Sequence, residues 1–313
     1  MVTYIAGRLA STVLVMGIVA VFVFLLLHLS PGDPAAIIAG DNATGEQIAA
    51  IRRQLGLDDA LPVQFFRWVT AVLQGDLGIS IFSNEPVAKL ISQRVEPTLS
   101  LALTTMTVAV TLAVSFGVLA AWKVGTWFDR AIMGFAVFGF SVPVFVVGYL
   151  LAYFFALQLE WLPVQGYTPI ARGLWPWLEN LILPSIALGC VYIALIARIT
   201  RATMLEVLQQ DYIRTARAKG LAQTPVLFIH ALKNASIPIV TVIGIGVALL
   251  IGGAVVTESV FVIPGLGRLT IDAILRRDYP VIQGVVLLFS FVYVLVNLAV
   301  DLVYTLIDPR IRY

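Results

Sequence analysis

The chain has 313 residues, of which 60% are hydrophobic and only 12% are charged. Soluble domains have about 25% charged residues, so the composition and a mean hydropathy of +0.96 exclude an ordinary soluble fold. The formal net charge of +2 gives no support for nucleic-acid binding. The single cysteine, Cys190, lies in an apolar stretch, so we expect a small buried hydrophobic residue and no intrachain disulfide.

Long apolar stretches predict an all-α, polytopic membrane protein with six transmembrane helices, because each can cross a hydrocarbon layer of about 30 Å. The first is too long for a signal peptide, and Ser30-Pro-Gly-Asp33 follows it instead of a cleavage site, so we expect a retained anchor. The third is long enough to require tilt or a kink at Pro143. The stretches are 9–29, 98–121, 131–158, 181–200, 236–257 and 282–306.

The longest non-membrane stretch, 30–97, is predicted to form a helical lobe. Thr44 is a suitable N-cap for a helix over 44–55, with Gln47 at the capping-box position and Gly56 at its end. A second helix, roughly 62–74, carries an apolar face. We expect the lobe to fold against the membrane surface.

The second span carries a stripe of hydroxyl groups. Hydroxyls hydrogen-bond within and between helices, and they would also suit the path of a polar substrate, so both interpretations stay open. The stripe consists of Ser100, Thr104, Thr107, Thr111 and Ser115.

A polar, basic loop at 201–235 stands between the fourth and fifth spans. Within it, Asp211 is a good N-cap, Gly220 is a good C′ residue, and the helix between them would be about 13 Å long. The loop is either a solvated basic segment or a short rigid helix that fits a groove of another protein. The residues at issue are Asp211, Tyr212, Arg214, Thr215, Ala216, Arg217, Lys219 and Gly220.

The fifth and last spans contain further candidates. Gly244, Ala248 and Gly252 form a small-residue ridge for packing against the second span or a partner. Glu258, at the outer end of the fifth span, is an outer-gate candidate or a solvated rim residue. In the last span, one helix face would either form a polar wall of the translocation route or hydrogen-bond to a neighbouring helix. That face holds Asn297, Asp301, Tyr304 and Asp308.

The distribution of basic residues predicts that both termini are cytoplasmic and that 30–97 lies outside. In that topology the cytoplasmic segments hold mostly bases, and the outer ones hold more acids than bases. The cytoplasmic bases are Arg8, Lys123, Arg130, Arg198, Arg201, Arg214, Arg217, Lys219, Lys233, Arg310 and Arg312, against the acids Asp129, Glu206, Asp211 and Asp308.

The loop sequence Asp211-Tyr-Ile-Arg-Thr-Ala-Arg-Ala-Lys-Gly220, followed by His230–Ala235 and Pro238, resembles the coupling loop of binding-protein-dependent ABC importer permeases. The similar branch serves dipeptides, oligopeptides, glutathione and nickel. Where the wider family's loop begins with Glu, this chain has Arg214, so any contact of that Glu does not carry over. Other matching segments are 29–34, 54–57, 75–78, 261–268, 277–280, 297–301 and 308–312.

The resemblance implies a permease subunit whose helix docks on a cytoplasmic ATPase subunit. It also implies the partners: a homologous second permease, two ATPase subunits and an extracytoplasmic binding protein, all acting at the bacterial inner membrane. Under this hypothesis the chain comprises an anchor at 1–29, the lobe at 30–97, a permease core at 98–306 and a cytoplasmic tail at 307–313.

The chain is not expected to be an enzyme or to bind a cofactor or metal. None of its lysines, Lys89, Lys123, Lys219 and Lys233, stands in a phosphate-loop motif, so ATP and magnesium would bind to the partner ATPases. His28 and His230 are predicted near opposite membrane faces and cannot share a metal ion. An ion-coupled secondary transporter is the rival hypothesis, with few buried acids to support it.

Overall fold

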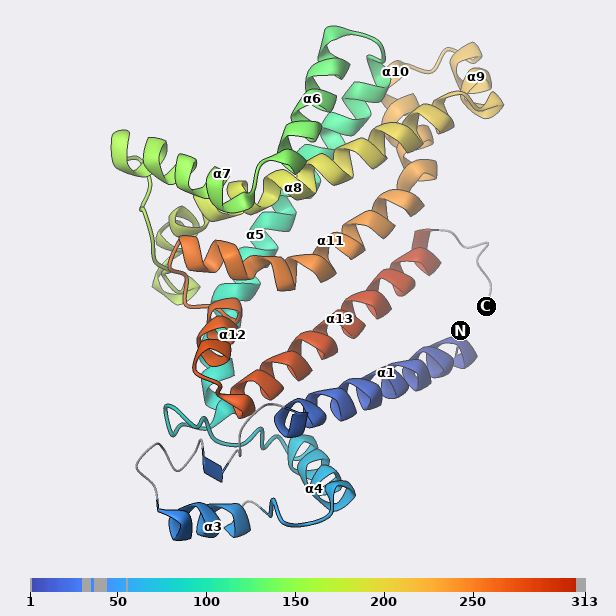
Figure 1. The fold of residues 1–313 in the computed structure, drawn as a ribbon. Helices are drawn as coiled ribbons and strands as arrows, with labels where there is room; N and C mark the ends of the chain where they lie inside the picture. Colours follow the sequence, from blue (N-terminus) through green and yellow to red (C-terminus); the bar gives the residue numbers. More distant parts are fainter. Residues whose placement is uncertain (1, 30–34, 37–43, 55, 308–313) are drawn as a thin grey trace. The chain divides into compact units, whose positions relative to one another are not determined.

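The computed structural model describes residues 2–29, 35–36, 44–54 and 56–307. Nearly all regular structure in these ranges is helical, and the only β-pairing that they contain is an isolated bridge between Ile79 and Pro86. The expected all-α class is therefore confirmed (Figure 1).

Within the described ranges, five helices are long and apolar enough to cross a membrane. A sixth crossing arises if a bent pair of helices counts as one span, which agrees with the six spans predicted. The five are α1 (Val2–Leu29), α5 (Val87–Trp122), α8 (Leu174–Leu208), α11 (Leu232–Val260) and α13 (Tyr279–Ile307).

The bent pair consists of α6 (Trp127–Ser141) and α7 (Val144–Leu151), which continues as the π-helical turn η1 (Ala152–Gln158). The two parts meet at an angle of 105°. Pro143 lacks an N–H group and forces the preceding residue out of the helical region, and Val142 is accordingly extended. The kink expected at Pro143 is thus present, but it is a complete break of the helix.

Two helices extend well beyond their apolar stretches. α5 begins at Val87 instead of near residue 98, and α8 begins at Leu174 and ends at Leu208 instead of covering 181–200. Pro97 and Pro184 lie inside these helices. Hydropathy marks the part of a helix that lies in lipid, whereas its ends depend on capping and on tertiary contacts.

The chain divides into two compact units. The first comprises Met1–Arg94 and Leu269–Val292, and the second Val95–Arg268 and Tyr293–Tyr313. The boundary expected at residue 97 lies close to this division, and the first unit also includes α1 and the segment 269–292. The two helices expected in the lobe are present as α3 (Gly45–Gln54) and α4 (Leu61–Leu73).

Local signals define the lobe helices. Thr44 and Gln47 form the expected capping box, with Thr44 N donating to Gln47 Oε1 at 2.9 Å and Gln47 N to Thr44 Oγ1 at 3.4 Å. Gly56 follows α3 with a φ of +65°, as expected of a C-terminal glycine. The predicted turn at 30–34 lies outside the described residues.

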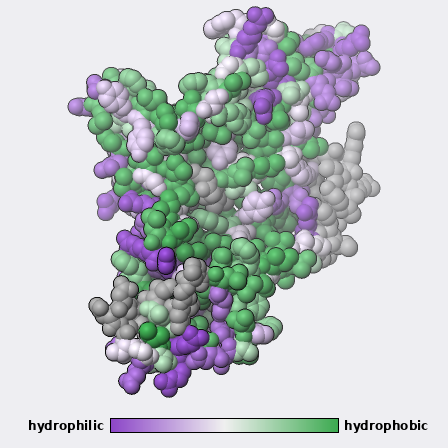
Figure 2. Space-filling view, in the orientation of Figure 1, coloured by the Kyte–Doolittle hydropathy of each residue, from purple (hydrophilic) through white to green (hydrophobic). Residues whose placement is uncertain are grey.

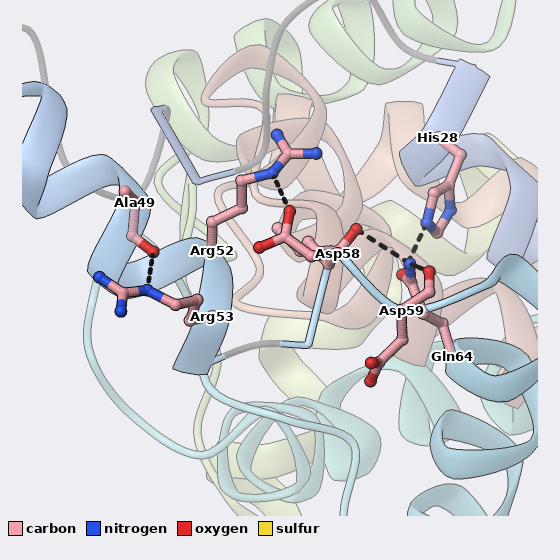
Figure 3. A network of polar contacts seen from close by, with 8 residues as sticks. His28, Ala49, Arg52, Arg53, Asp58, Asp59 and Gln64 are labelled. Carbon is pink, nitrogen blue, oxygen red and sulfur yellow. Dashed lines mark hydrogen bonds and ion pairs between the residues drawn. The ribbon is translucent and has the colours of Figure 1, made fainter.

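In the first unit, aromatic rings and one polar network join α4 to the end of α1. The Phe24 ring lies 5.4 Å from Phe65 and 5.9 Å from Trp68. His28 Nε2 lies 3.1 Å from Gln64 Oε1, and Gln64 Nε2 donates to the carbonyl oxygens of Leu57 and Asp59 at 3.1 and 2.8 Å (Figure 3). A buried polar side chain is thus fully used to fix the lobe to α1.

The segment 277–280, which the resemblance singled out, also supports the lobe. Ser80 Oγ donates to Asp278 Oδ2 at 2.5 Å, and the Ile81 N–H donates to Asp278 Oδ1 at 3.2 Å. Asp278 is buried, so these bonds fix the loop before α5 to the segment that precedes α13.

In the second unit α8 is the central helix and contacts α6, α7 and α11. Glycines permit the closest approaches: a Cβ on Gly117 would lie 2.8 Å from the carbonyl oxygen of Ala197, and one on Gly139 would lie 3.0 Å from that of Cys190. Most of the α8 residues that face these neighbours are apolar and buried. Hydrophobic residues cover much of the outer surface as well, as expected for helices in lipid (Figure 2).

Candidate functional site

The predicted helix in the loop between the fourth and fifth spans is present as α9 (Asp211–Ala218). Its C-terminal turn is closed by two bonds, from Gly220 N to Arg217 O at 2.9 Å and from Leu221 N to Ala216 O at 3.3 Å. Gly220 has a φ of +80°, so the expected C′ glycine is confirmed in a Schellman arrangement.

The other end of α9 differs from the prediction. Asp211 is the first helical residue, and Gln210 occupies the N-cap position without a side-chain cap bond. The Asp211 carboxylate is therefore free to pair with Arg214 at 3.3 Å, and its charge still favours the positive end of the helix.

One apolar residue anchors α9 to the membrane helices. Ile213 is fully buried, whereas its neighbours Tyr212 and Arg214 are exposed. The sequence does not indicate this role, because a single isoleucine in a polar run creates no apolar periodicity. It packs in a cluster with Val118, Ala121, Met204, Val226, Leu227, Ala231, Ala235 and Ile239.

The rest of α9 forms an exposed polar surface, seen as the hydrophilic patch over this helix in Figure 2. The side chains of Asp211 and Arg214 are 93% and 77% exposed. Tyr212 is 43% exposed, and partial burial raises its pKa. Thr215 donates to the Asp211 carbonyl at 3.0 Å, Ala216 is half-buried, and Arg217, Lys219 and Gly220 are exposed. This short, capped and anchored helix can present a fixed surface to another protein.

A partly buried ion pair lies among the helices that carry α9. Arg201 Nε and Nη2 donate to Asp129 Oδ1 and Oδ2 at 2.5 and 2.7 Å. The Gly125 N–H donates to the same carboxylate at 3.0 Å. The side chains of Asp129 and Arg201 are 5% and 24% exposed. The sequence predicts both only as cytoplasmic charges, and the fold brings them together.

The hydroxyl groups of the α5 stripe do not all lie in the same environment. Ser100 is buried, receives the Trp177 indole N–H at 3.0 Å and lies 3.0 Å from the Tyr167 hydroxyl, whose pKa is raised by burial. Thr104 is buried and lies 2.7 Å from Ser185 Oγ. Thr107, Thr111 and Ser115 are exposed in the single chain. Two of the stripe's members therefore join α5 to α8 and to the loop that precedes α8, and three face outward.

The polar face of α13 is likewise divided. Asn297 is exposed and donates to the Tyr293 carbonyl at 3.1 Å, and Asp301 is half-buried. Tyr304 donates to Thr241 Oγ1 on α11 at 2.8 Å, which is the helix-to-helix bond that one of the two interpretations expected. Asp308 lies outside the described residues.

One member of the small-residue ridge of α11, Gly244, packs within the chain. A Cβ on Gly244 would collide with Val300 of α13. At Gly244 the close approach is therefore made to the last span, whereas packing against the second span or a partner was expected. The side-chain surroundings of Gly252 lie outside the part of the chain that the structure describes.

Glu258 is not a solvated rim residue, which was one of the two expectations, because its side chain is fully buried. Thr98 Oγ1 donates to Glu258 Oε1 at 2.6 Å, and the Arg268 N–H donates to Oε2 at 2.9 Å. Thr98 also accepts the Leu266 N–H at 2.8 Å, and a Cβ on Gly265 would collide with the carboxylate. The segment 261–268 folds back over α11 and encloses the side chain.

Two family descriptions cover almost the whole chain. Residues 113–313 match the binding-protein-dependent transport system inner membrane component, and residues 1–102 match the N-terminal membrane component of the same systems. The chain belongs to this permease family. It is a multi-pass inner membrane protein and a permease subunit of an importer.

Curated relatives of this permease cover its full length. It is 60% identical to a probable peptide ABC transporter permease of Sinorhizobium fredii over 310 residues, 99% of each chain. It is 47% identical to the glutathione transport system permease GsiC of Salmonella paratyphi A over 313 residues, all of both chains.

Solved structures share the permease's fold. An inward-facing structure of the MetNI methionine ABC transporter aligns with a TM-score of 0.58 at 18% identity. The alignment covers 70% of this chain and 96% of that one. The ABC importer permease fold implied by the resemblance is thereby confirmed.

Proposed function

We propose that this permease imports a peptide-type substrate, such as a dipeptide, an oligopeptide or glutathione, and that α9 couples it to separate ATPase subunits. The observation that carries the coupling role is the geometry of α9, a short helix closed at its C-terminal end, with one buried anchor, Ile213, and a mostly exposed surface. A rigid element of this kind transmits movement because it cannot deform independently of the helices beneath it. The relatives named for peptides and glutathione support the substrate class.

The complete transporter comprises this permease, a second homologous permease, two ATPase subunits and a binding protein outside the cell. ATP and magnesium bind to the ATPase subunits. Both chain termini and α9 lie in the cytoplasm, and the lobe lies outside, as the excess of basic residues favours.

The docking role of α9 is tested by enlarging one exposed residue. Ala218→Trp places an indole on the outer surface of α9, where it costs little folding energy but prevents close seating in a groove. We expect the variant to insert normally and to lose most of the copurifying ATPase. Ala171→Trp, also at an exposed alanine but before α8, is the matched control and should retain the ATPase. Full ATPase recovery with Ala218→Trp would refute docking at this surface.

The substrate class is tested separately with the complete transporter. Labelled dipeptide, glutathione and nickel are offered in parallel, each with the binding protein present. Uptake of a peptide or of glutathione supports the proposal, whereas uptake of nickel alone contradicts it.

A further inference from the structure

We infer that Asp129 and Arg201 are positioning residues that make the α5–α6 hairpin move together with α9 during transport. This inference rests on the proposed coupling role of α9. It assigns a role in coupling to a partly buried ion pair that lies outside α9 itself.

The ion pair joins α6 to α8 with a defined geometry. Two guanidinium nitrogens of Arg201 contact the Asp129 carboxylate: Nε lies 2.5 Å from Oδ1, and Nη2 lies 2.7 Å from Oδ2. A two-point contact fixes orientation as well as distance, unlike a single point-charge contact. Asp129 also accepts the Gly125 N–H at 3.0 Å, so the same carboxylate holds the turn between α5 and α6.

The apolar side of the same region joins α9 to these helices. Ile213 of α9 packs in one cluster with Val118 and Ala121 of α5 and with Met204 of α8. Met204 follows Arg201 by less than one helical turn, so the ion pair and the cluster hold neighbouring parts of α8. Gly117 of α5 lies against Thr200, which precedes Arg201 directly.

The two contacts have different consequences for movement. Apolar packing resists separation but permits sliding, because it is not directional. The two-point ion pair adds a directional contact, so α6 cannot rotate about its axis relative to α8 without breaking it. A push on α9 is therefore delivered to α5, α6 and α8 as one body.

Loss of the pair should reduce coupling more than assembly. In the complete reconstituted transporter, we expect Arg201→Gln to lower the ratio of substrate taken up to ATP hydrolysed. The decrease should be at least about fivefold, which is the lower end of typical coupling factors. Arg201→Lys keeps the charge but not the fork and should give an intermediate ratio. Arg130→Gln removes a neighbouring but exposed arginine and should leave the ratio unchanged.

A charge exchange separates coupling from folding. The double variant Asp129→Arg/Arg201→Asp restores the opposite charges and should raise the uptake-to-hydrolysis ratio above that of Arg201→Gln. A wild-type ratio in an assembled Arg201→Gln complex would overturn the inference. In that case the proposed function would stand, because the ATPase subunits would still be bound and their ATP hydrolysis would still depend on the substrate.

A distance measurement keeps the test decisive where variants fail to insert. After Cys190→Ser, spin labels at Trp127, at the start of α6, and at Ala222, just after α9, report their separation in the intact transporter; both sites are exposed. We expect the same distance with and without ATP, while a label pair between Ala222 and the partner permease changes. A nucleotide-dependent distance between Trp127 and Ala222 would contradict the inference.

Discussion

Glu258 shows how a single side chain can organise a loop that its sequence position suggests is solvated. Its carboxylate accepts bonds from Thr98, which is 160 residues away in the chain, and from the backbone of Arg268. The glycine at 265 leaves the space that the carboxylate occupies. The sequence places an acid at the outer end of an apolar span, which is typical of a rim residue. Its burial depends on contacts with Thr98 and with the segment 265–268, which the sequence position does not reveal.

Removing the Glu258 carboxylate should destabilise the outer end of α11. Glu258→Ala leaves the Thr98 hydroxyl and the Arg268 N–H without their acceptor, at a cost of about 1–3 kcal/mol for each buried group. We expect a lower apparent Tm of the purified protein in detergent and a smaller loss for Glu258→Gln. Ser259→Ala, at an exposed neighbour, is the control. An unchanged Tm for Glu258→Ala would show that these bonds contribute nothing.

At the scale of helices, apolar stretches predict the existence of spans better than their ends. The sequence predicts the helices of the lobe, the capping box at Thr44 and the C-terminal glycine of α9, because each depends on nearby residues. It does not predict the extension of α5 to Val87 or the full break at Pro143. Ile213 and the Asp129–Arg201 pair escape sequence reasoning because their partners come from other helices.

The C-terminal turn of α9 should be required for coupling. Gly220→Val places a β-branched residue at a φ of +80°, which costs about 1–2 kcal/mol and favours another path for the chain. We expect the valine variant to insert normally. Either substrate uptake per ATP hydrolysed should fall, or less ATPase should copurify. Gly220→Asn, which tolerates the left-handed region, should remain close to wild type. Unchanged uptake and stable ATPase copurification in the valine variant would count against the role of α9.

For the whole molecule, the decisive question of topology concerns the bent pair α6–α7. If the pair crosses the membrane, residues 123–126 and 159–169 lie on opposite sides. A re-entrant pair would place both on one side and would put the two termini on opposite faces. Basic residues occur in 123–130 and in the loop 201–235. They favour a crossing, because only then do these two segments both lie in the cytoplasm.

Labelling of single cysteines in intact cells tests this topology. In the Cys190→Ser background, we expect an impermeant maleimide to label Gln165→Cys from outside and to label Val124→Cys only after permeabilisation; both positions are exposed. Reporter fusions after Ala235 and Tyr313 should indicate cytoplasm, and one near Asp59 should indicate the outside. Equal external labelling of both cysteines, or an external C-terminus, would contradict six crossings.

As the permease subunit of an importer, this chain should be unable to transport alone. The most direct test compares liposomes containing the chain alone with liposomes that also contain the second permease and the ATPase subunits. We expect the chain alone to show neither ATP hydrolysis nor uptake driven by a proton or sodium gradient. The complete set should import a peptide-type substrate only when ATP and the binding protein are present. Gradient-driven uptake by the chain alone would contradict the account and would make Asp301 the first candidate for an ion or proton carrier.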